Sequence, residues 1–272
     1  MKIGIVGSLM DPAAVNMARH IVDEYGFNDA EPMAGADESF ISGDVSLHMI
    51  NMEAWKYAGA DGLGCDLLVF VSKHRSAKGI PALTTHSLGN WNDRNDLGGE
   101  PHKLSAAAPV EMLGTLRRLS GVDVAVAKVY EATHHGPLLN TPSLFVELGG
   151  SDEMIGNVEL AHKIGKVTYG AVLSALDGVE AYDKRVIGIG SNHYPEKFSR
   201  MALERGYAFS YIFPKYAMLN ADGSDNQGMI GKAVEMTKGI DLAVIEWKSL
   251  NAPMREMALG VLNELGVDHE RV

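Results

Sequence analysis

Cysteine is nearly absent from this sequence of 272 residues. Cys65 is the only one, so no intramolecular disulfide can form. A zinc site that relies on two or more thiolates is excluded for the same reason. Any metal ion that the chain binds must therefore be held mainly by its histidine and carboxylate side chains.

Long apolar runs are missing as well. No stretch approaches the roughly 18 apolar residues that a membrane span needs, so we expect no membrane partner. The start, "MKIGIVGSLMDPAAV", is interrupted by Asp11 and Pro12, so we expect no signal peptide and a cytoplasmic protein. With 46% hydrophobic residues, the chain can bury a sizeable core. We expect one compact unit over residues 1–272, with a weakly marked boundary near residue 178.

Positive charge is in the minority, and the formal net charge of −11 by itself argues against a nucleic-acid-binding protein. We expect no DNA partner. The charge is unevenly distributed. Residues 67–91 contain no acidic side chain but hold Lys73, Arg75 and Lys78. Such an island in an acidic protein can face an anionic substrate, or it can be an ordinary solvated surface. On charge alone, both interpretations stay open.

Short apolar runs rich in valine and isoleucine alternate with helical patterns. This alternation predicts an α/β layered fold, with a mixed, largely parallel sheet flanked by helices. Strands are predicted within residues 2–6, 45–51, 66–72, 82–86, 122–132, 143–149, 185–190, 207–213 and 241–247. The clearest helices are predicted over residues 11–26, 105–121 and 152–176.

Side chains at the predicted helix starts suggest how two helices begin. Asp11 is a predicted N-cap with Pro12 at the first helical position, and Ser105 is a second predicted N-cap. The clearest loop is "WNDRNDLGGEPHK", residues 91–103, whose Gly-Gly and Pro favour a segment that faces the substrate.

Common nucleotide and serine-hydrolase signatures are absent. The stretch "IGIVGS" matches neither G-x-G-x-x-G nor G-x-x-x-x-G-K-[ST], so we interpret it as an ordinary strand-to-helix turn. The sequence also lacks the G-x-S-x-G elbow, which makes a covalent serine mechanism the least favoured chemistry.

Five of the ten histidines fall at the ends of predicted strands or in the adjacent loops. Sites in open α/β sheets gather beyond the carboxyl ends of strands, so these histidines can converge on one crevice. Singly, each is more often a hydrogen-bonded structural residue, but jointly the five favour a site. The candidate catalytic residues are His74, His86, His134, His135 and His193.

This histidine cluster suits two kinds of chemistry. Three imidazoles with a bound water form a hydrolytic zinc centre, and Glu147 near a strand end can add a carboxylate. Alternatively, a histidine can act directly as general base towards water. No compact motif such as H-E-x-x-H is present, so both remain open. The candidate metal ligands, which overlap with the catalytic set, are His74, His86, His134 and Glu147.

A second informative stretch is "SNHYPEKFSRMALERGYAFSYIFPKYAM". Pro195 suits the start of a helix, whose free N–H groups can face an anion or oxyanion. Lys197 and Lys215 add positive charge nearby. The predicted substrate-binding residues are Lys73, Arg75, Lys78, Asn90, Lys197 and Lys215.

Three blocks of unusual sequence follow one another along the chain: "SKHRSAKGIPALTTHSLGNW", "THHGPLLNTPSLFVELGGS" and "NHYPEKFSRMALERGYAFSYIFPKYAM". Together they resemble the archaeal and plant type of D-aminoacyl-tRNA deacylase. The resemblance implies translation quality control, by hydrolysis of the ester that joins a D-amino acid to the terminal ribose of tRNA. It also implies zinc (Zn²⁺) dependence and a fold akin to peptidyl-tRNA hydrolases and nucleoside phosphorylases. The expected partner is the acceptor end of D-aminoacyl-tRNA.

Two other functions stay open. A metal-dependent peptidase or amidohydrolase could use the same scaffold, and a non-catalytic nucleotide- or RNA-binding module would need no turnover. The clustering of histidines argues against the binding module. The sequence does not specify an oligomeric state, and we take a monomer as the expectation.

Overall fold

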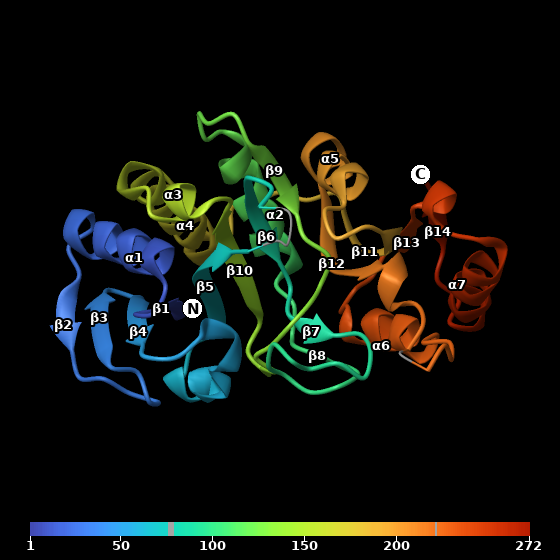
Figure 1. The fold of residues 1–272 in the computed structure, drawn as a ribbon, viewed down its shortest axis with the longest axis horizontal. Helices are drawn as coiled ribbons and strands as arrows, with labels where there is room; N and C mark the ends of the chain where they lie inside the picture. The colour runs from blue at the N-terminus through green and yellow to red at the C-terminus, as the bar shows by residue number, and fades with distance from the viewer. Residues whose placement is uncertain (76–78, 221) are drawn as a thin grey trace.

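The computed structural model describes residues 1–75, 79–220 and 222–272, and Figure 1 shows two open β-sheets lying side by side. The larger sheet has eight strands. In spatial order they are β2 (Asn28–Ala30), β3 (Glu38–Ser42), β4 (Val45–Ile50), β1 (Ile3–Ser8), β5 (Leu67–His74), β10 (Ser143–Gly149), β6 (Ala82–His86) and β9 (Ala127–Tyr130).

The centre of the larger sheet is parallel and its margins are not. Strands β4, β1, β5 and β10 run the same way, whereas β3 is antiparallel to β4 and β6 is antiparallel to β10. Strand β9 pairs with β6 in parallel. The prediction of a mixed, largely parallel sheet is thus confirmed.

The smaller sheet is formed entirely by the last third of the chain. Its four strands are parallel, in the order β12 (Tyr207–Pro214), β11 (Lys184–Ser191), β13 (Leu242–Ile245) and β14 (His269–Arg271). A separate two-stranded ladder is made by β7 (Gly89–Asn90) and β8 (Lys103–Leu104).

Helices flank both sheets, and in Figure 1 α1, α3 and α4 lie along one face of the larger sheet. The α-helices are α1 (Pro12–Glu24), α2 (Pro109–Ser120), α3 (Asp152–Ile155), α4 (Val158–Asp177), α5 (Glu196–Arg205), α6 (Gly228–Met236) and α7 (Ala252–Glu264). The short 3-10 helices are η1 (Ala54–Lys56), η2 (Ala58–Leu63), η3 (Lys215–Ala217) and η4 (Trp247–Ser249). Within the described ranges, no helix is long and apolar enough to cross a membrane.

The central strands are buried on both faces, which explains their nearly continuous apolar sequences. Successive side chains of a strand point to opposite faces. In β5, Val69 and Val71 accordingly join the core beneath the helices, whereas Leu68 and Phe70 pack with the residues of η1 and η2. The sheet is therefore a rigid wall whose strand ends can hold functional side chains in fixed positions.

The helix starts agree with prediction at one position and differ at another. The Asp11 carboxylate caps α1 by accepting hydrogen bonds from the backbone N–H groups of Ala13 and Ala14, as predicted. Ser105 does not cap α2, which begins at Pro109. Its hydroxyl instead donates to the carbonyl of Pro137 and accepts from a backbone N–H, so it ties two loops together.

Two predicted elements are shorter than expected. The helix predicted over residues 152–176 is broken into α3 and α4, because Asn157 accepts a hydrogen bond from the N–H of Leu160 and starts a new helix there. The strand predicted over residues 122–132 is regular only over Ala127–Tyr130. The chain leaves the sheet after Tyr130, and the next residues belong to the candidate site.

Candidate active site

Two buried carboxylates form the centre of the histidine cluster. Glu147 lies in β10 and Glu131 follows directly after β9, and both side chains are almost fully buried. Burial alone would raise the pKa of Glu147. The hydrogen bond from His74 and the nearby ring of His86 outweigh burial and hold that pKa well below its usual range.

His74, the last residue of β5, connects the two carboxylates. Its Nδ1 lies 3.2 Å from Oε2 of Glu147 and 3.2 Å from Oε1 of Glu131. On the other side of the ring, Nε2 lies 2.7 Å from the hydroxyl of Tyr194. Burial lowers the pKa of His74, but the two carboxylates outweigh it and the net shift is upward. The imidazole is thus fixed from three directions.

Three further imidazoles share one feature, a hydrogen bond from Nδ1 to a backbone carbonyl. His86, His134 and His135 donate to the carbonyls of Ser87, Ala132 and Gly136, at 3.1, 2.8 and 2.7 Å. Because only an N–H can donate to a carbonyl, a neutral ring must carry its lone pair on Nε2. Ligand atoms of these three histidines lie within 4.8 Å of one another.

The charge states of these three histidines differ. Burial lowers the pKa of His135 to about 4 and that of His134 well below the usual value, and the neighbouring histidines add to the effect. Both rings are therefore neutral at pH 7. Burial also lowers the pKa of His86, but the carboxylates of Glu147 and Glu131 outweigh it and raise the value.

His193 completes the cluster from the smaller sheet, two residues after β11 ends. Its Nε2 lies 2.9 Å from Oε2 of Glu131, and its Nδ1 lies 3.3 Å from the hydroxyl of Tyr216. The histidine ring is stacked on His74, with centroids 5.6 Å apart. The candidate site is therefore built at the seam between the two sheets.

Backbone hydrogen bonds hold this seam together. The N–H of Ala132 donates to the carbonyl of His193 at 2.8 Å, and the N–H of Thr133 donates to that of Ile212 at 3.0 Å. The hydroxyl of Thr133 in turn accepts from the N–H of Ile212. The segment after β9 thus joins β11 and β12, and this pairing places Glu131 opposite His193.

Both histidines of the "EATHHGP" stretch reach the cluster because the strand has already ended. On an extended strand, adjacent side chains would point to opposite faces. His135 instead has a φ of +44°, in the left-handed region. The two rings consequently lie edge to face, with centroids 4.3 Å apart.

His86 enters the cluster in a way that the sequence did not predict. We expected all five histidines beyond the carboxyl ends of parallel strands. Strand β6, however, runs antiparallel to β10, so His86 pairs in register with Phe145, two residues before Glu147. Its ring stacks on Phe145 with an interplanar angle of 5° and a centroid distance of 5.2 Å. His86 therefore reaches the cluster from within the sheet rather than from its edge.

The structure groups the candidate metal ligands differently from the predicted set. His74, His86, His134 and Glu147 do not form one group of mutually close ligand atoms among the described residues. The groups with ligand atoms within 4.8 Å are His86 with His134 and His135, His74 with Glu131 and His193, and His86 with Glu131 and Glu147.

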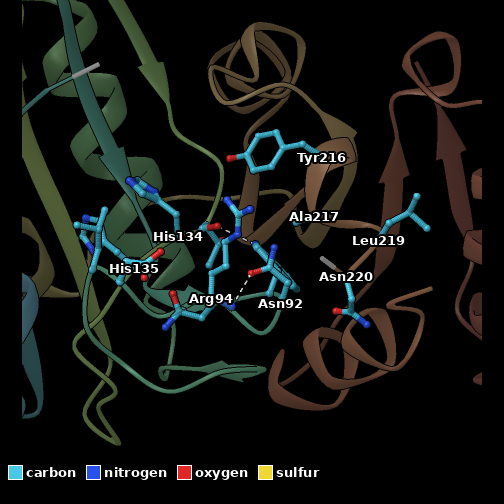
Figure 2. Close-up of a pocket in the computed structure, with 14 residues that line it drawn as sticks. Asn92, Arg94, His134, His135, Tyr216, Ala217, Leu219 and Asn220 are labelled. Atoms are coloured by element: carbon cyan, nitrogen blue, oxygen red, sulfur yellow. Dashed lines mark hydrogen bonds between the residues drawn. The ribbon is translucent and has the colours of Figure 1, made fainter. Parts of the chain in front are cut away.

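Two cavities meet at the cluster. The larger, of about 510 Å³, is lined by Arg94, Tyr216 and the loop after β7, as Figure 2 shows. The smaller, of about 380 Å³, is lined by Trp55, His74 and His193 among others. Both His134 and His135 line the two cavities, so the histidine cluster forms the wall between them.

The loop predicted at residues 91–103 closes one side of both cavities through Leu97. It is seated tightly against the segment that carries the histidines. A Cβ atom added at Gly136 would lie 2.6 Å from the carbonyl carbon of Gly98 and 2.8 Å from the carbonyl oxygen of Trp55. Only glycine at position 136 permits this close approach.

The predicted substrate-binding residues are dispersed. Lys73, Arg75 and Asn90 line a cavity, but Arg75 also pairs with Asp152 at 2.7 Å, and the Asn90 amide donates to carbonyls of the 91–103 loop.

Neither Lys197 nor Lys215 belongs to the described lining of the two cavities. Lys197 lies 3.3 Å from Glu246, and Lys215 begins η3. Lys78 lies outside the described residues.

Sequence reasoning missed the residue at the centre. Glu131 stands three positions before His134 and within the strand predicted over residues 122–132, but β9 ends at Tyr130, two residues earlier than predicted. Arg94, inside the predicted loop, was missed as well. Tyr194 and Tyr216 are further members that the sequence did not indicate, and each hydrogen-bonds a histidine.

Comparison with known proteins agrees with these features. A sequence profile of the D-aminoacyl-tRNA deacylase family matches residues 62–270. D-aminoacyl-tRNA deacylases of Thermococcus onnurineus and Thermococcus kodakarensis are 33% and 31% identical, with complete coverage of both chains in each case. A crystal structure of a conserved protein of unknown function, AF0625, is 22% identical and superimposes with a TM-score of 0.83, covering 99% of this chain and 95% of that one.

A mixed α/β scaffold with a buried histidine and glutamate cluster defines a hydrolase-like protein. The chain belongs to the D-aminoacyl-tRNA deacylase family, because both the profile and the full-length relatives identify it. The resemblance noted in the sequence is confirmed. The alternative of a metal-dependent peptidase or amidohydrolase finds no support in these comparisons.

Proposed function

We propose that this protein hydrolyses the ester bond of D-aminoacyl-tRNA at the histidine and glutamate cluster, releasing a free D-amino acid and tRNA. The observation that carries the proposal is the group formed by His86, His134 and His135, three converging imidazoles beside two buried carboxylates. Family membership gives the substrate class. The substrate supports a cytoplasmic location, and we keep a monomer as the expected form.

The residues present fit a zinc ion. In His86, His134 and His135, the Nδ1 hydrogen bonds to backbone carbonyls leave Nε2 free, as in protein sites that bind zinc through histidine. Nε2 of His86 is buried and has no hydrogen-bond partner among the described residues. A cation at this position would be coordinated by Nε2 of His86. It would replace the proton that the neighbouring carboxylates stabilise on that ring. When bound, zinc would polarise a water molecule and lower its pKa.

The other side chains of the cluster suit proton transfer. In the proposed reaction, a water oxygen attacks the ester carbonyl and its proton passes to His74 or His193. The bond from the carbonyl carbon to the ribose oxygen then breaks, and that oxygen takes up a proton. Glu131 and Glu147 hold the two imidazoles in orientation, because their oxygens lie 2.9 to 3.2 Å from ring nitrogens.

The test is hydrolysis of D-tyrosyl-tRNA and L-tyrosyl-tRNA by purified protein, before and after chelation and after zinc is added back. We expect cleavage of the D-ester alone, lost on chelation and restored by zinc. D-selective cleavage that resists chelation would keep the substrate and remove zinc from the proposal. No cleavage of either ester by folded, zinc-loaded protein would overturn the function.

A further inference from the structure

The two cavities share a wall, so a substrate that reacts at this wall places one part in each cavity. If the proposed function holds, the ester bond lies beside His134 and His135, which line both cavities. The terminal adenosine of the tRNA must then occupy one cavity and the aminoacyl group the other. The chemistry of the two linings decides which is which.

The larger cavity offers groups that recognise a nucleotide. The side chain of Tyr216 is 56% exposed, and its hydroxyl is anchored 3.3 Å from Nδ1 of His193, so the ring is held in place with its surface accessible. Aromatic rings of this kind stack on nucleic-acid bases. Figure 2 shows Arg94 among the side chains that line the same cavity, together with Tyr216 and the two histidines.

Arg94 is the cation that this cavity provides. Asn92 accepts a hydrogen bond from its backbone N–H at 3.1 Å, which orders the turn that carries it. Within the described residues, its guanidinium makes no ion pair. An exposed, unpaired guanidinium in a chain of net charge −11 is suited to bind a phosphate, because its planar donors match phosphate oxygens.

The smaller cavity has a different lining. It contains the carboxylates of Glu53 and Glu147 beside the ring of Trp55. Lys73 and Arg75 line it as well, and Arg75 is already paired with Asp152 at 2.7 Å. Its volume of about 380 Å³ is smaller than the 510 Å³ of its neighbour. Because Arg75 is already paired, the carboxylates of Glu53 and Glu147 can bind the ammonium group of an amino acid, while Trp55 contacts its side chain.

We propose that the larger cavity binds the 3′-terminal adenosine of the tRNA, with Tyr216 stacked on the adenine and Arg94 paired with the 5′-phosphate of that nucleotide. The aminoacyl group then occupies the smaller cavity, against Trp55. This assignment of the two cavities rests on the proposed function. Beyond that function, it specifies how the substrate is oriented in the site. It also predicts that the protein binds adenosine monophosphate in the absence of any ester.

Calorimetric titration of the full-length protein with adenosine monophosphate and with adenosine tests the assignment. Tyr216→Leu should weaken the binding of both ligands at least about fivefold, whereas Tyr216→Phe, which keeps the ring, should bind both like the wild type. Arg94→Gln should weaken the binding of adenosine monophosphate about three- to tenfold. The binding of adenosine should be unchanged, because adenosine carries no phosphate. Tyr182→Leu, at an exposed tyrosine outside both cavities, is the matched control.

Three results would overturn the assignment. They are no binding of either ligand by folded wild-type protein at millimolar concentration, equal binding by Tyr216→Leu and wild type, and loss of monophosphate binding in Trp55→Leu alone. Because the titration involves no ester, it is independent of hydrolysis. Protein that cleaves D-tyrosyl-tRNA but fails the titration refutes the orientation only, and protein that binds the nucleotide without cleaving the ester refutes the proposed function.

Discussion

The carboxylate of Glu131 lies 2.9 Å from Nε2 of His193, and this pair joins the two sheets of the molecule. Glu131 extends from β9 at the margin of the larger sheet, and His193 follows β11 of the smaller one. Glu131 also lies 3.2 Å from Nδ1 of His74 through its other oxygen. One carboxylate therefore orients the two imidazoles to which we assign proton transfer.

Glu131→Gln should lower kcat for D-tyrosyl-tRNA by about a hundredfold, a typical loss when general acid–base catalysis is impaired. The amide keeps the size of the side chain but removes the negative charge that holds the imidazoles of His74 and His193 in orientation. Steady-state kinetics measures this, with Glu159→Gln on the exposed face of α4 as the control. A rate within twofold of the wild type would show that Glu131 has no role in turnover.

The histidines should separate into two classes when zinc content and activity are measured together. His86→Ala, His134→Ala and His135→Ala should lose bound zinc, because each removes one proposed ligand. They should also lose the rise in melting temperature that zinc produces, since a ligand that binds only the native state stabilises it.

His74→Ala and His193→Ala should instead retain zinc and lose turnover. Elemental analysis of the purified variants, with thermal unfolding in parallel, distinguishes the classes. Equal zinc content in all five variants would contradict the division of roles.

Gly136→Ala should displace the 91–103 loop, because the added methyl group would approach Gly98 and Trp55 to within 3 Å. We expect an increase in KM and a loss of stability of about 1–3 kcal/mol, as is usual for overpacking.

Gly260→Ala is the matched control for this substitution. Position 260 lies in α7 and a Cβ there meets no atom within 4 Å, so alanine should stabilise the protein by up to about 1 kcal/mol. Denaturant unfolding measures both. If Gly136→Ala were as stable and active as the control, the loop would not be held by this contact.

His48 should make the stability of the fold depend on pH. Burial lowers its pKa to about 4 in the folded state, below the value of 6.5 expected when the chain is unfolded. Between these values the unfolded chain binds more protons, so stability is highest above pH 6.5 and falls as the pH falls towards 4.

Urea unfolding at several pH values, compared between wild type and His48→Leu, tests this. The variant loses hydrogen bonds to Ser39 and Ser46, so its absolute stability should be lower. Its stability should nevertheless fall less steeply than that of the wild type between pH 6.5 and 4. Identical slopes would refute the assignment to His48.

The elements of the fold were predictable where their apolar pattern was continuous. The central strand β5 is nearly all apolar, and α1 begins with the Asp11 cap that its sequence indicates. The break between α3 and α4 was hidden, because helical periodicity continues on both sides of Asn157. Ser105 was assigned to a helix cap because cap residues are recognised from nearby sequence, whereas its partners Pro137 and Leu139 are more than 30 positions away.

The members of the site were more predictable than their arrangement. Histidine is uncommon enough at strand ends that five of them suggested one cluster, and the structure does bring them together. Which nitrogen of each ring is free depends on single backbone carbonyls, such as that of Ala132 for His134. Those contacts arise from tertiary structure, as does the pairing of Glu131 with a residue 62 positions later, so no local pattern could indicate them.

The location of the site at the seam also affects how the protein is made. His193, Tyr194 and Tyr216 are among the last third of residues to leave the ribosome, whereas His74 and His86 emerge early. A nascent chain that has completed only the larger sheet has made Glu131 and Glu147 but not His193, Tyr194 and Tyr216. The proposed site is therefore complete only after the second sheet has been synthesised and has paired with the segment after β9.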